Sequence, residues 1–298
     1  MSIVEIDQLT KDYEIGFWRK RKVRGLDALS LAVEQGEIFG FLGANGAGKT
    51  TTLKVLMRLT FPTSGKARIL GEDIDKVSMH RIGYLPENPY FYDYLTAREF
   101  LEYCAELFGQ PKQARKRNAE DLLSRVRLDE KRWDTQLRKF SKGMLQRVGL
   151  AQALINDPEI VFLDEPMSGL DPVGRREVRD LIASLRESGK TVFMCSHILS
   201  DIEVLCDRVA ILKKGKLAHM GRLNDLRQQQ NQENLVEIIV TQTDVPETFV
   251  VTETPGGVRI QAPGESDVDV VLTALRKVNG KLVSVQPLRQ SLEELFVD

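Results

Sequence analysis

Eight consecutive residues near the N-terminus combine small side chains with a lysine and a threonine, a set that can bind phosphate. The run is Gly43, Ala44, Asn45, Gly46, Ala47, Gly48, Lys49 and Thr50. Glycines allow the backbone to turn tightly and to direct successive N–H groups at phosphate oxygens. Lys49 can then reach the β- and γ-phosphates, while the Thr50 hydroxyl can be a ligand of Mg²⁺. The run therefore predicts a P-loop that binds a nucleoside triphosphate.

Two elements must hold this loop in place. Residues 37–42 form an apolar run that predicts a buried strand entering the loop, and residues 51–57 predict a helix leaving it. The N-terminus of that helix, where Thr51 lies, adds partial positive charge beside the phosphates. A glycine-rich run can also be an ordinary turn, but the full pattern between a strand and a helix favours the nucleotide site. We count Thr51 among the residues of that site.

A second candidate for chemistry follows another apolar run. Residues 160–163 lead directly into Asp164 and Glu165. Because side chains alternate along a regular strand, the two carboxylates cannot share a face while the strand stays regular. Asp164 can then hold Mg²⁺ through water, and Glu165 can point at an attacking water. Capping of the next element is the alternative, but the P-loop upstream favours a metal ligand and a base.

The P-loop and the Asp164–Glu165 pair are accompanied by further short motifs in the order typical of the ATP-binding cassette (ABC) family. The chain therefore resembles that family. Residues 140–144, FSKGM, stand where the family has its signature, and residues 168–171, SGLD, look like its D-loop. His197 closes an apolar strand like the family's switch histidine, and Tyr13 lies where an aromatic residue stacks on adenine. Each motif is weak alone, whereas their ordered succession is specific.

The resemblance implies an ATPase whose cofactors are ATP and Mg²⁺ and whose site is shared between two chains. Ser141 and Gly143 would contact the γ-phosphate of a nucleotide bound by the second chain, and Asp171 would lie in the D-loop beside it. His197 would hydrogen-bond the γ-phosphate and relay its presence to Glu165. Lys49, Glu165 and His197 are thus the expected catalytic residues.

At two motifs the sequence departs from the family pattern, and there the family's residue roles do not transfer directly to this chain. The signature has Lys142 and Met144 in place of a glycine and a glutamine, and the Q-loop position holds Glu87 in place of glutamine. Glutamate can still bind a hard metal ion, so Glu87 stands with Thr50 and Asp164 as an expected metal ligand. Its side chain would add a negative charge beside the triphosphate, so whether this position binds the metal as in the family is left open.

The overall composition agrees with a cytoplasmic ATPase. The chain has 298 residues, 42% hydrophobic and 29% charged, with a net charge of −1, which argues against nucleic acid as the main partner. Three scattered cysteines lack metal-ligand spacing, and Cys104 falls on an apolar helical stripe typical of a core thiol. No apolar run is long enough for a membrane span and no signal peptide is visible. We therefore expect the channel on another polypeptide.

The expected fold is α/β: a P-loop ATPase core with an antiparallel N-terminal flap and a helical insertion, followed by a small C-terminal α+β domain. The expected boundaries are 1–227 for the nucleotide-binding domain, about 88–145 for its helical subdomain, 228–234 for a polar linker and 235–298 for the accessory domain. Flap strands are expected over 2–9 and 23–34, and the alternation through residue 213 predicts a parallel sheet. Residues 17–24 form a basic loop with two aromatics that could contact anionic lipid or could be a solvated hairpin tip.

Helices are expected over 96–109, where a capping box opens the run, around 118–126, and from the signature onward. In the accessory domain, strands are expected near 235–241, 248–253, 258–262 and 282–286, with helices from 266 and over 291–296.

The resemblance thus implies an ATP-hydrolysing subunit of an ABC transporter that forms a homodimer around two ATP·Mg²⁺. It would lie peripherally on the cytoplasmic face of the cell membrane and power an integral-membrane permease, as in exporters of the drug, polysaccharide and gliding-type group. The alternative is a soluble ABC ATPase acting on a ribosome or a chromosome. Those classes carry two cassettes in one chain or long coiled coils, and neither pattern occurs here. A scaffold that binds ATP without turnover would lack a base, whereas Glu165 is present.

Overall fold

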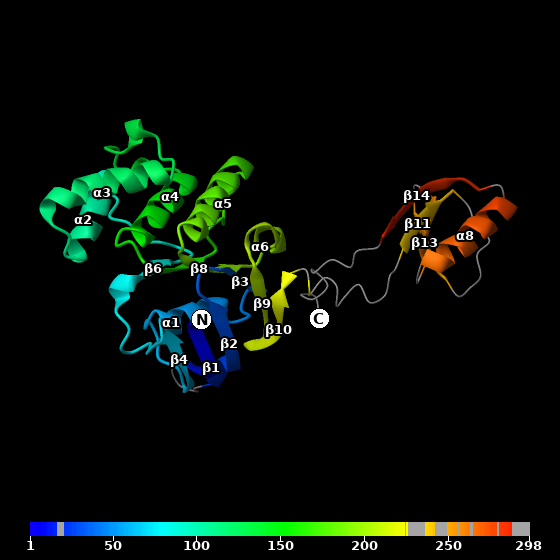
Figure 1. Cartoon of the computed structure of the whole chain (residues 1–298), viewed down its shortest axis with the longest axis horizontal. Coiled ribbons are helices and arrows are strands. Elements are labelled where there is room, and N and C mark those ends of the chain that lie inside the picture. Colours follow the sequence, from blue (N-terminus) through cyan, green and yellow to red (C-terminus); the bar gives the residue numbers. More distant parts are fainter. Residues whose placement is uncertain are drawn as a thin grey trace. The chain divides into compact units, whose positions relative to one another are not determined.

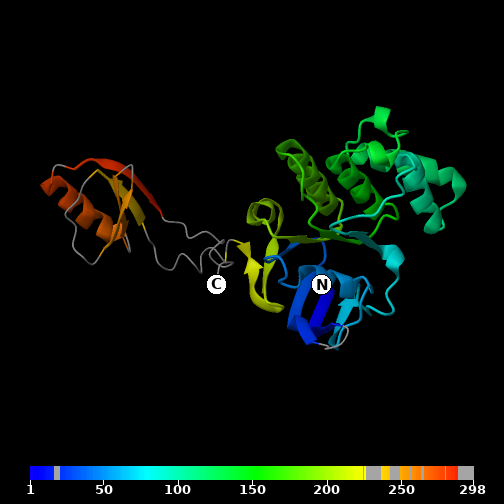
Figure 2. The same cartoon turned by 180° about the vertical axis from the view of Figure 1, so that it is seen from behind.

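The computed structural model describes residues 1–16, 21–223, 225, 236–241, 249–254, 257–262, 265–278 and 280–287. The chain divides into two compact units, Met1–Leu223 and Asn224–Asp298. Figure 1 shows the ribbon coloured along the chain, and Figure 2 shows it from behind. Each unit is described by itself. Within the described residues, no helix is long and apolar enough to cross a membrane.

A six-stranded sheet forms the centre of the first unit, in the order β10-β9-β3-β8-β7-β6. Its strands are β3 (Ile38–Leu42), β6 (Ile82–Leu85), β7 (Ile160–Asp164), β8 (Thr191–Ser196), β9 (Arg208–Lys213) and β10 (Lys216–Arg222). All neighbours pair in parallel except β10, which lies antiparallel on β9 at the edge. The parallel sheet predicted from the sequence is confirmed, with one antiparallel strand added.

The N-terminal flap is a second sheet, in the order β2-β1-β4-β5. Its strands are β1 (Ser2–Ile15), β2 (Arg21–Glu34), β4 (Ser64–Ile69) and β5 (Glu72–Asp73), and all pairs are antiparallel. The antiparallel flap is confirmed, although β1 is longer than the predicted 2–9. A register shift near Gln8, whose φ is 48°, interrupts the apolar alternation that marks a strand in the sequence. The tip of the predicted basic loop, residues 17–20, lies outside the described residues.

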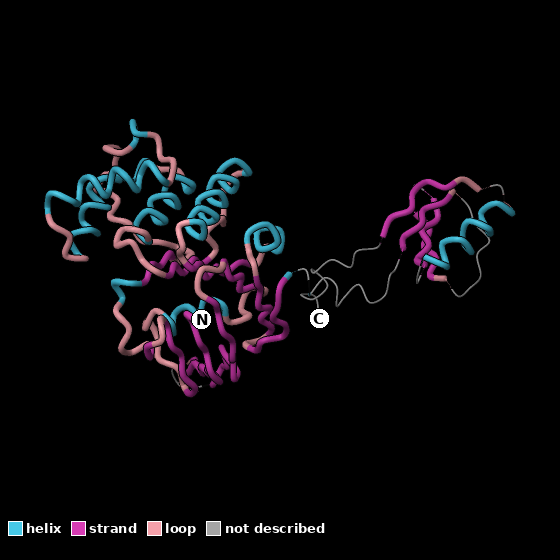
Figure 3. The backbone as a smooth tube through the Cα atoms, in the orientation of Figure 1, coloured by secondary structure: helices cyan, strands magenta, loops and turns pink. Residues whose placement is uncertain are grey.

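Helices cover the face of the central sheet that lies opposite the flap (Figure 3). They are α2 (Ala97–Leu107), α3 (Lys112–Arg125), α4 (Lys142–Ala153), α5 (Pro172–Glu187) and α6 (Leu199–Leu205), while α1 (Lys49–Leu56) lies on the flap side. Short 3₁₀ turns occupy Met79–Arg81, Glu130–Arg132 and Leu137–Lys139.

The predicted capping box is confirmed, since Thr96 Oγ1 accepts from the Glu99 N–H and Glu99 Oε2 accepts from the Thr96 N–H. Helix α3 begins at Lys112, earlier than the predicted 118–126. The sequence analysis missed this start because the first turns of the helix are polar and show no apolar periodicity.

One apolar core joins the flap to the central sheet. Four phenylalanines at its centre come from three adjacent strands, and Phe193 lies within 5.4 Å, centroid to centroid, of Phe39, Phe41 and Phe162. All four side chains are fully buried. Aromatic packing of this kind adds to ordinary area burial. The strands that end beside the P-loop are therefore anchored to the flap through this core.

The second unit is a small α+β domain. Its sheet has the order β12-β13-β11-β14, formed by β11 (Val236–Val240), β12 (Val250–Thr254), β13 (Gly257–Ala262) and β14 (Leu282–Pro287). Helix α8 (Glu265–Lys277) packs on this sheet through Val271 and Leu275. The predicted strands and the helix from 266 are confirmed. The expected linker at 228–234 and the helix at 291–296 lie outside the described residues.

Candidate nucleotide-binding and hydrolysis site

The P-loop turns sharply between β3 and α1, and its glycines are required by the backbone. Gly46 and Gly48 have φ of 82° and 112°, in the region that favours glycine. A Cβ on Gly48 would lie 2.7 Å from the carbonyl oxygen of Gly25, so a larger residue would collide with the flap. The chain direction reverses here, and the first N–H groups of α1 are left without helical partners for a ligand to use.

Lys49, the first residue of α1, points back into the loop. Its Nζ donates to the carbonyl oxygen of Gly43 at 2.7 Å and lies 3.6 Å from Oε1 of Glu165. The side chains of Lys49 and Glu165 are each only 7% exposed. Nζ of Lys49 also donates to the carbonyl oxygen of Ala44 at 3.4 Å. The ammonium is therefore held by oxygen atoms of the protein that a triphosphate, with its greater negative charge, could replace.

Glu165 lies directly after β7 in an unusual backbone conformation. Its φ is 52°, and its N–H donates to the carbonyl oxygen of Cys195 on β8 at 3.0 Å. The left-handed conformation interrupts the strand at this residue, so the alternation expected of a regular strand no longer applies. The carboxylate lines the cavity at the P-loop, with Oε2 2.9 Å from Nδ1 of His197. A strained residue held by its neighbours is a common feature of functional sites.

Asp164, by contrast, is buried with an exposure of 1% and is not among the residues that line this cavity. Neither of its carboxylate oxygens has a hydrogen-bond partner that meets normal geometry among the described residues. Burial raises the pKa of Asp164 to about 6, and the nearby Thr50 hydroxyl opposes this rise. The charges of Glu165 and Glu87 raise this pKa further. A buried carboxylate of this kind requires a compensating cation or a proton.

The donors around Asp164 fit Mg²⁺. Thr50 and Asp164 offer hard oxygen atoms, and Glu87 lines the adjacent cavity. No group of three or more His, Cys, Asp or Glu side chains is placed to hold a metal by itself in the part of the chain that the structure describes. Mg²⁺ usually keeps several waters and is bound by one or two carboxylates together with substrate phosphates. A sparse oxygen set beside a phosphate loop suits that preference.

The structure brings part of the P-loop, together with Thr51, Glu87 and Glu165, to one cavity of about 300 Å³. Its lining residues are Gly25, Asn45, Gly46, Gly48, Lys49, Thr50, Thr51, Glu87 and Glu165. Tyr13 lies at its margin, with its hydroxyl 3.4 Å from Oγ1 of Thr51. The sequence analysis missed Gly25, which leaves room for the Tyr13 ring because a Cβ there would be 2.8 Å from it. No motif in the sequence marks this glycine.

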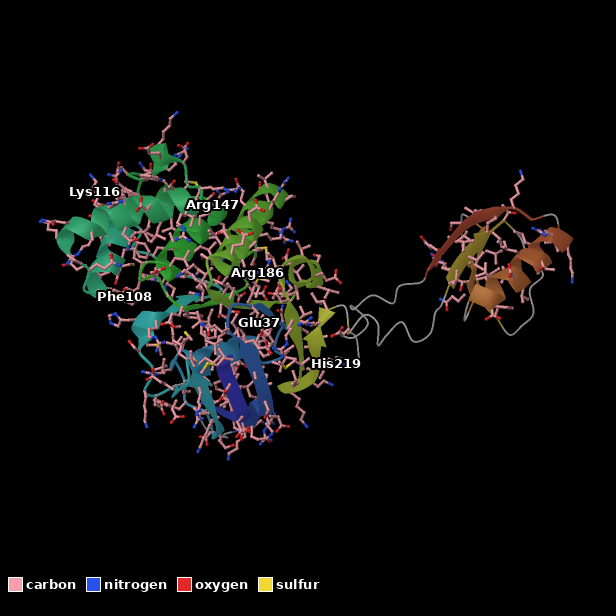
Figure 4. The ribbon with its side chains drawn as sticks, viewed as in Figure 1. Glu37, Phe108, Lys116, Arg147, Arg186 and His219 are labelled. Carbon is pink, nitrogen blue, oxygen red and sulfur yellow. The ribbon has the colours of Figure 1, made fainter. Side chains whose placement is uncertain are left out.

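Ser141, Gly143 and Asp171 belong to a different cavity. Ser141 caps α4 by accepting from the N–H of Met144, and Asp171 caps α5 by accepting from that of Gly174. The three residues line a cavity of about 260 Å³ together with Arg127, Leu128, Asp129, Arg132, Met144, Arg147, Leu170 and Gly174. Arg147 lies among the helices in Figure 4. Within one chain, the signature and the P-loop therefore do not share a cavity.

Cys104 and two histidines without a motif context, His80 and His219, lie outside this site. Cys104 is buried on α2, and burial raises the pKa of its thiol to about 12, which confirms the prediction of a core thiol. The ring of His80 packs edge-on against Phe108 at 5.3 Å between centroids. His219 lies on the edge strand β10.

Comparison with known proteins identifies the family of this chain. The family described as "ABC transporter" matches residues 26–168. An uncharacterized ABC transporter ATP-binding protein of Synechocystis sp. is 46% identical over 99% of this chain and 84% of its own length. The chain belongs to the ATP-binding proteins of ABC transporters. The bacitracin transport ATP-binding protein BcrA of Bacillus licheniformis is 44% identical over 72% of this chain and 68% of its own length.

Solved structures of ABC cassettes have the same fold. The ATP-binding cassette MJ0796, in a dimeric post-hydrolysis state bound to ADP and Pi, matches with a TM-score of 0.68 and 26% identity. It covers 74% of this ABC subunit and 98% of its own chain. An ATP-binding subunit of an ABC transporter matches with a TM-score of 0.67 and 30% identity, over 77% and 94% of the two chains. The predicted P-loop ATPase fold is confirmed, and the chain is an ATP-binding ATPase of this family.

Proposed function

We propose that two copies of this ATPase enclose two ATP·Mg²⁺ head to tail and thereby drive a separate integral-membrane permease. The observation that carries the proposal is the division of the predicted residues between two cavities of one chain, the P-loop set in one and the signature set in the other. A second copy can present its signature to the first copy's P-loop. The dimeric form of the related cassette MJ0796 supports such a pairing.

In the proposed site, the P-loop residues of one chain hold the phosphates and Tyr13 stacks on adenine. Lys49 exchanges the Gly43 carbonyl and Glu165 for the β- and γ-phosphates, because the triphosphate is the stronger anion. Ser141 of the partner subunit and Gly143 of the partner subunit close over the γ-phosphate, where the N-terminus of α4 adds a favourable dipole. Asp171 lies beside them in the D-loop.

Hydrolysis then depends on Glu165. Once Lys49 has turned to the phosphates, the Glu165 carboxylate is free to orient and deprotonate a water, while His197 keeps its other oxygen in place and contacts the γ-phosphate. Thr50, Asp164 and Glu87 would hold Mg²⁺, which neutralises charge on the phosphate oxygens. Loss of the γ-phosphate removes the anion that joins the two chains, so the dimer opens.

For the whole chain we propose a nucleotide-binding domain over 1–227, with its helical subdomain at about 88–145, a linker at 228–234 and an accessory domain at 235–298. The proposed location is the cytoplasmic face of the cell membrane, bound peripherally to the permease. Export is favoured because the signature with Lys142, the Glu87 position and the C-terminal extension resemble exporter ATPases. Relatives that are named for bacitracin transport support a role in transport.

The proposal is tested by isolating the tagged full chain from detergent-solubilised membranes with ATP and Mg²⁺. We expect a membrane protein with several spans to co-purify in a fixed ratio, and the pair to transport its substrate out of cells only with active ATPase. A pair carrying Lys49→Ala is the matched control for transport. Co-purification with ribosomes or chromosomal DNA and no membrane protein would instead support the soluble alternative.

A further inference from the structure

Helix α4 presents two side chains to the segment that connects Glu165 to the D-loop. Lys142 and Gln146 are four residues apart in the helix, so they lie on one face. Both meet the segment 166–170, which comes immediately after Glu165. The signature and the proposed base of the same chain are therefore joined through one helix face.

Gln146 holds the backbone next to Glu165. Its side chain is 3% exposed, and Nε2 donates to the carbonyl oxygen of Pro166 at 3.0 Å. On the other side, the Glu165 N–H is held by the carbonyl oxygen of Cys195. The left-handed backbone at Glu165 thus lies between two fixed hydrogen bonds. A buried carbonyl that loses its donor is costly, so the segment would move to find another.

Lys142 lies across the D-loop one turn earlier on the same helix face. An ideal Cβ on Gly169 would be 2.6 Å from Nζ of Lys142 and 2.8 Å from its Cδ and Cε. Gly169 has φ of 71°, a value that favours glycine. The Lys142 side chain occupies the space that a side chain at residue 169 would fill. A Cβ on the neighbouring Gly143 would meet Cδ2 of Leu170 at 3.3 Å. The departure from the family signature at Lys142 is therefore a contact with the D-loop.

We propose that Gln146 and Lys142 are positioning residues for hydrolysis. Through them, a change in the position of the α4 N-terminus alters the position of Glu165 in the same chain. The inference rests on the proposed role of Glu165 as the base. When Ser141 and Gly143 engage a nucleotide held by the second copy, any shift of α4 reaches the Pro166 carbonyl through Gln146 and the D-loop through Lys142. The signature of one chain contacts the nucleotide held by the partner's P-loop. It thereby adjusts Glu165 of its own chain, which acts on the second nucleotide of the dimer.

The first test replaces Gln146 by methionine in the full chain. Gln146→Met keeps the length and the helix preference of the side chain but removes the donor. We expect kcat for ATP hydrolysis to fall about 10- to 100-fold, because a small misplacement of a catalytic group has effects of this size, while KM for ATP changes less than about twofold. Gln152→Met, the same substitution in the same helix, is the control and keeps the parental kcat.

The second test combines Gln146→Met with Glu165→Gln. If Gln146 acts through Glu165, its removal adds almost nothing once the carboxylate is gone, and the double variant has the residual rate of Glu165→Gln alone. A general structural defect would instead multiply the two losses. Multiplied losses, or a kcat for Gln146→Met equal to that for Gln152→Met, would overturn the inference.

The proposed role of Glu165 is judged separately, because Glu165→Gln alone must lower the rate whatever Gln146 does. Lys142→Ala provides a variant at an exposed position if Gln146→Met does not fold. We expect it to lower kcat about tenfold, with no further loss in the Glu165→Gln background, and Lys142→Met to restore most of the rate because its side chain still covers Gly169. Unchanged turnover in Lys142→Ala, or a loss that multiplies with Glu165→Gln, would contradict the inference.

Discussion

Nδ1 of His197 lies 2.9 Å from Oε2 of Glu165, so an imidazole at the end of β8 contacts the carboxylate at the end of β7. The two strands are neighbours in the parallel sheet, and their carboxyl ends meet at the same edge. Glu165 is buried, whereas the His197 side chain is 42% exposed. The pair can therefore connect an incoming phosphate to a buried base.

Glu165→Gln should separate ATP binding from hydrolysis. The substitution keeps the size of the side chain and most of its hydrogen bonding but removes the base, whose contribution is typically about 10²- to 10⁴-fold. We expect kcat to fall by that range and an ATP-bound dimer to accumulate, seen as a shift to larger size in size-exclusion chromatography with ATP. Hydrolysis at the parental rate would show that Glu165 is not the base.

Lys49→Ala should abolish most ATP binding while leaving the fold intact. Lys49 is the cation that the P-loop directs at phosphate, and its loss leaves the loop's backbone N–H groups alone to hold the triphosphate. We expect ATP affinity to fall at least about tenfold and hydrolysis to fall to near background, measured by calorimetry and phosphate release. Lys54→Ala, at an exposed position of the same helix, is the control. Near-normal turnover in folded Lys49→Ala would contradict the site assignment.

The loop chemistry could be predicted from the sequence because it is local. The eight residues of the P-loop carry their own backbone requirements, and the buried strands beside them are short apolar runs without a competing helical period. The order of the later motifs then identified the family. Most strands and helices could be predicted for the same reason, because their signals are local. The capping box at Thr96 and Glu99 is an example.

Other parts of the site depend on contacts between distant segments. Gly25 is required because a Cβ there would lie 2.8 Å from the Tyr13 ring, and nothing near residue 25 in the sequence indicates this. The left-handed backbone of Glu165 is likewise held by Cys195, thirty residues later in the chain. The hydrogen bond from Gln146 to Pro166 arises only when α4 packs against the segment that follows β7. Periodicity and motif spacing do not contain such information.

The buried carboxylate of Asp164 should make the nucleotide-free, metal-free protein less stable as pH rises. Burial raises its folded-state pKa from 3.8 to about 6, so between these values the unfolded chain has lost the proton and the folded chain has kept it. Stability therefore falls with increasing pH across this window, by at most about 3 kcal/mol from this group.

Asp164→Asn removes this charge, so in EDTA the variant should be more stable than the parent at pH 7.5, and the difference should shrink toward pH 4.5. Urea unfolding at the two pH values measures this effect. Asp121→Asn, on the exposed side of α3, is the control and should show no such change. An Asp164→Asn variant that is less stable at pH 7.5 than at pH 4.5, relative to the parent, would contradict the predicted cost of the buried charge.

The separation of P-loop and signature into two cavities leads to a complementation experiment. Lys49→Ala damages the P-loop, and Ser141→Arg damages the signature; each is combined with Glu165→Gln to stop turnover. In either homodimer both sites contain one damaged half, so neither variant should form a stable ATP-bound dimer alone. In a mixed dimer, both lesions fall in one composite site, and the other site has an intact P-loop facing an intact signature.

Mixing the two variants should therefore restore part of the ATP binding and dimerisation, up to one nucleotide per dimer. Size-exclusion chromatography measures association, and nucleotide retained per dimer is measured on the same fractions, because strong coupling between the sites can hide a single intact one in either signal alone. If the signature served the nucleotide of its own chain, every site would remain damaged after mixing. No gain in either measurement would then rule out the head-to-tail dimer, since Ser141 would not complete the site that Lys49 of the other copy begins.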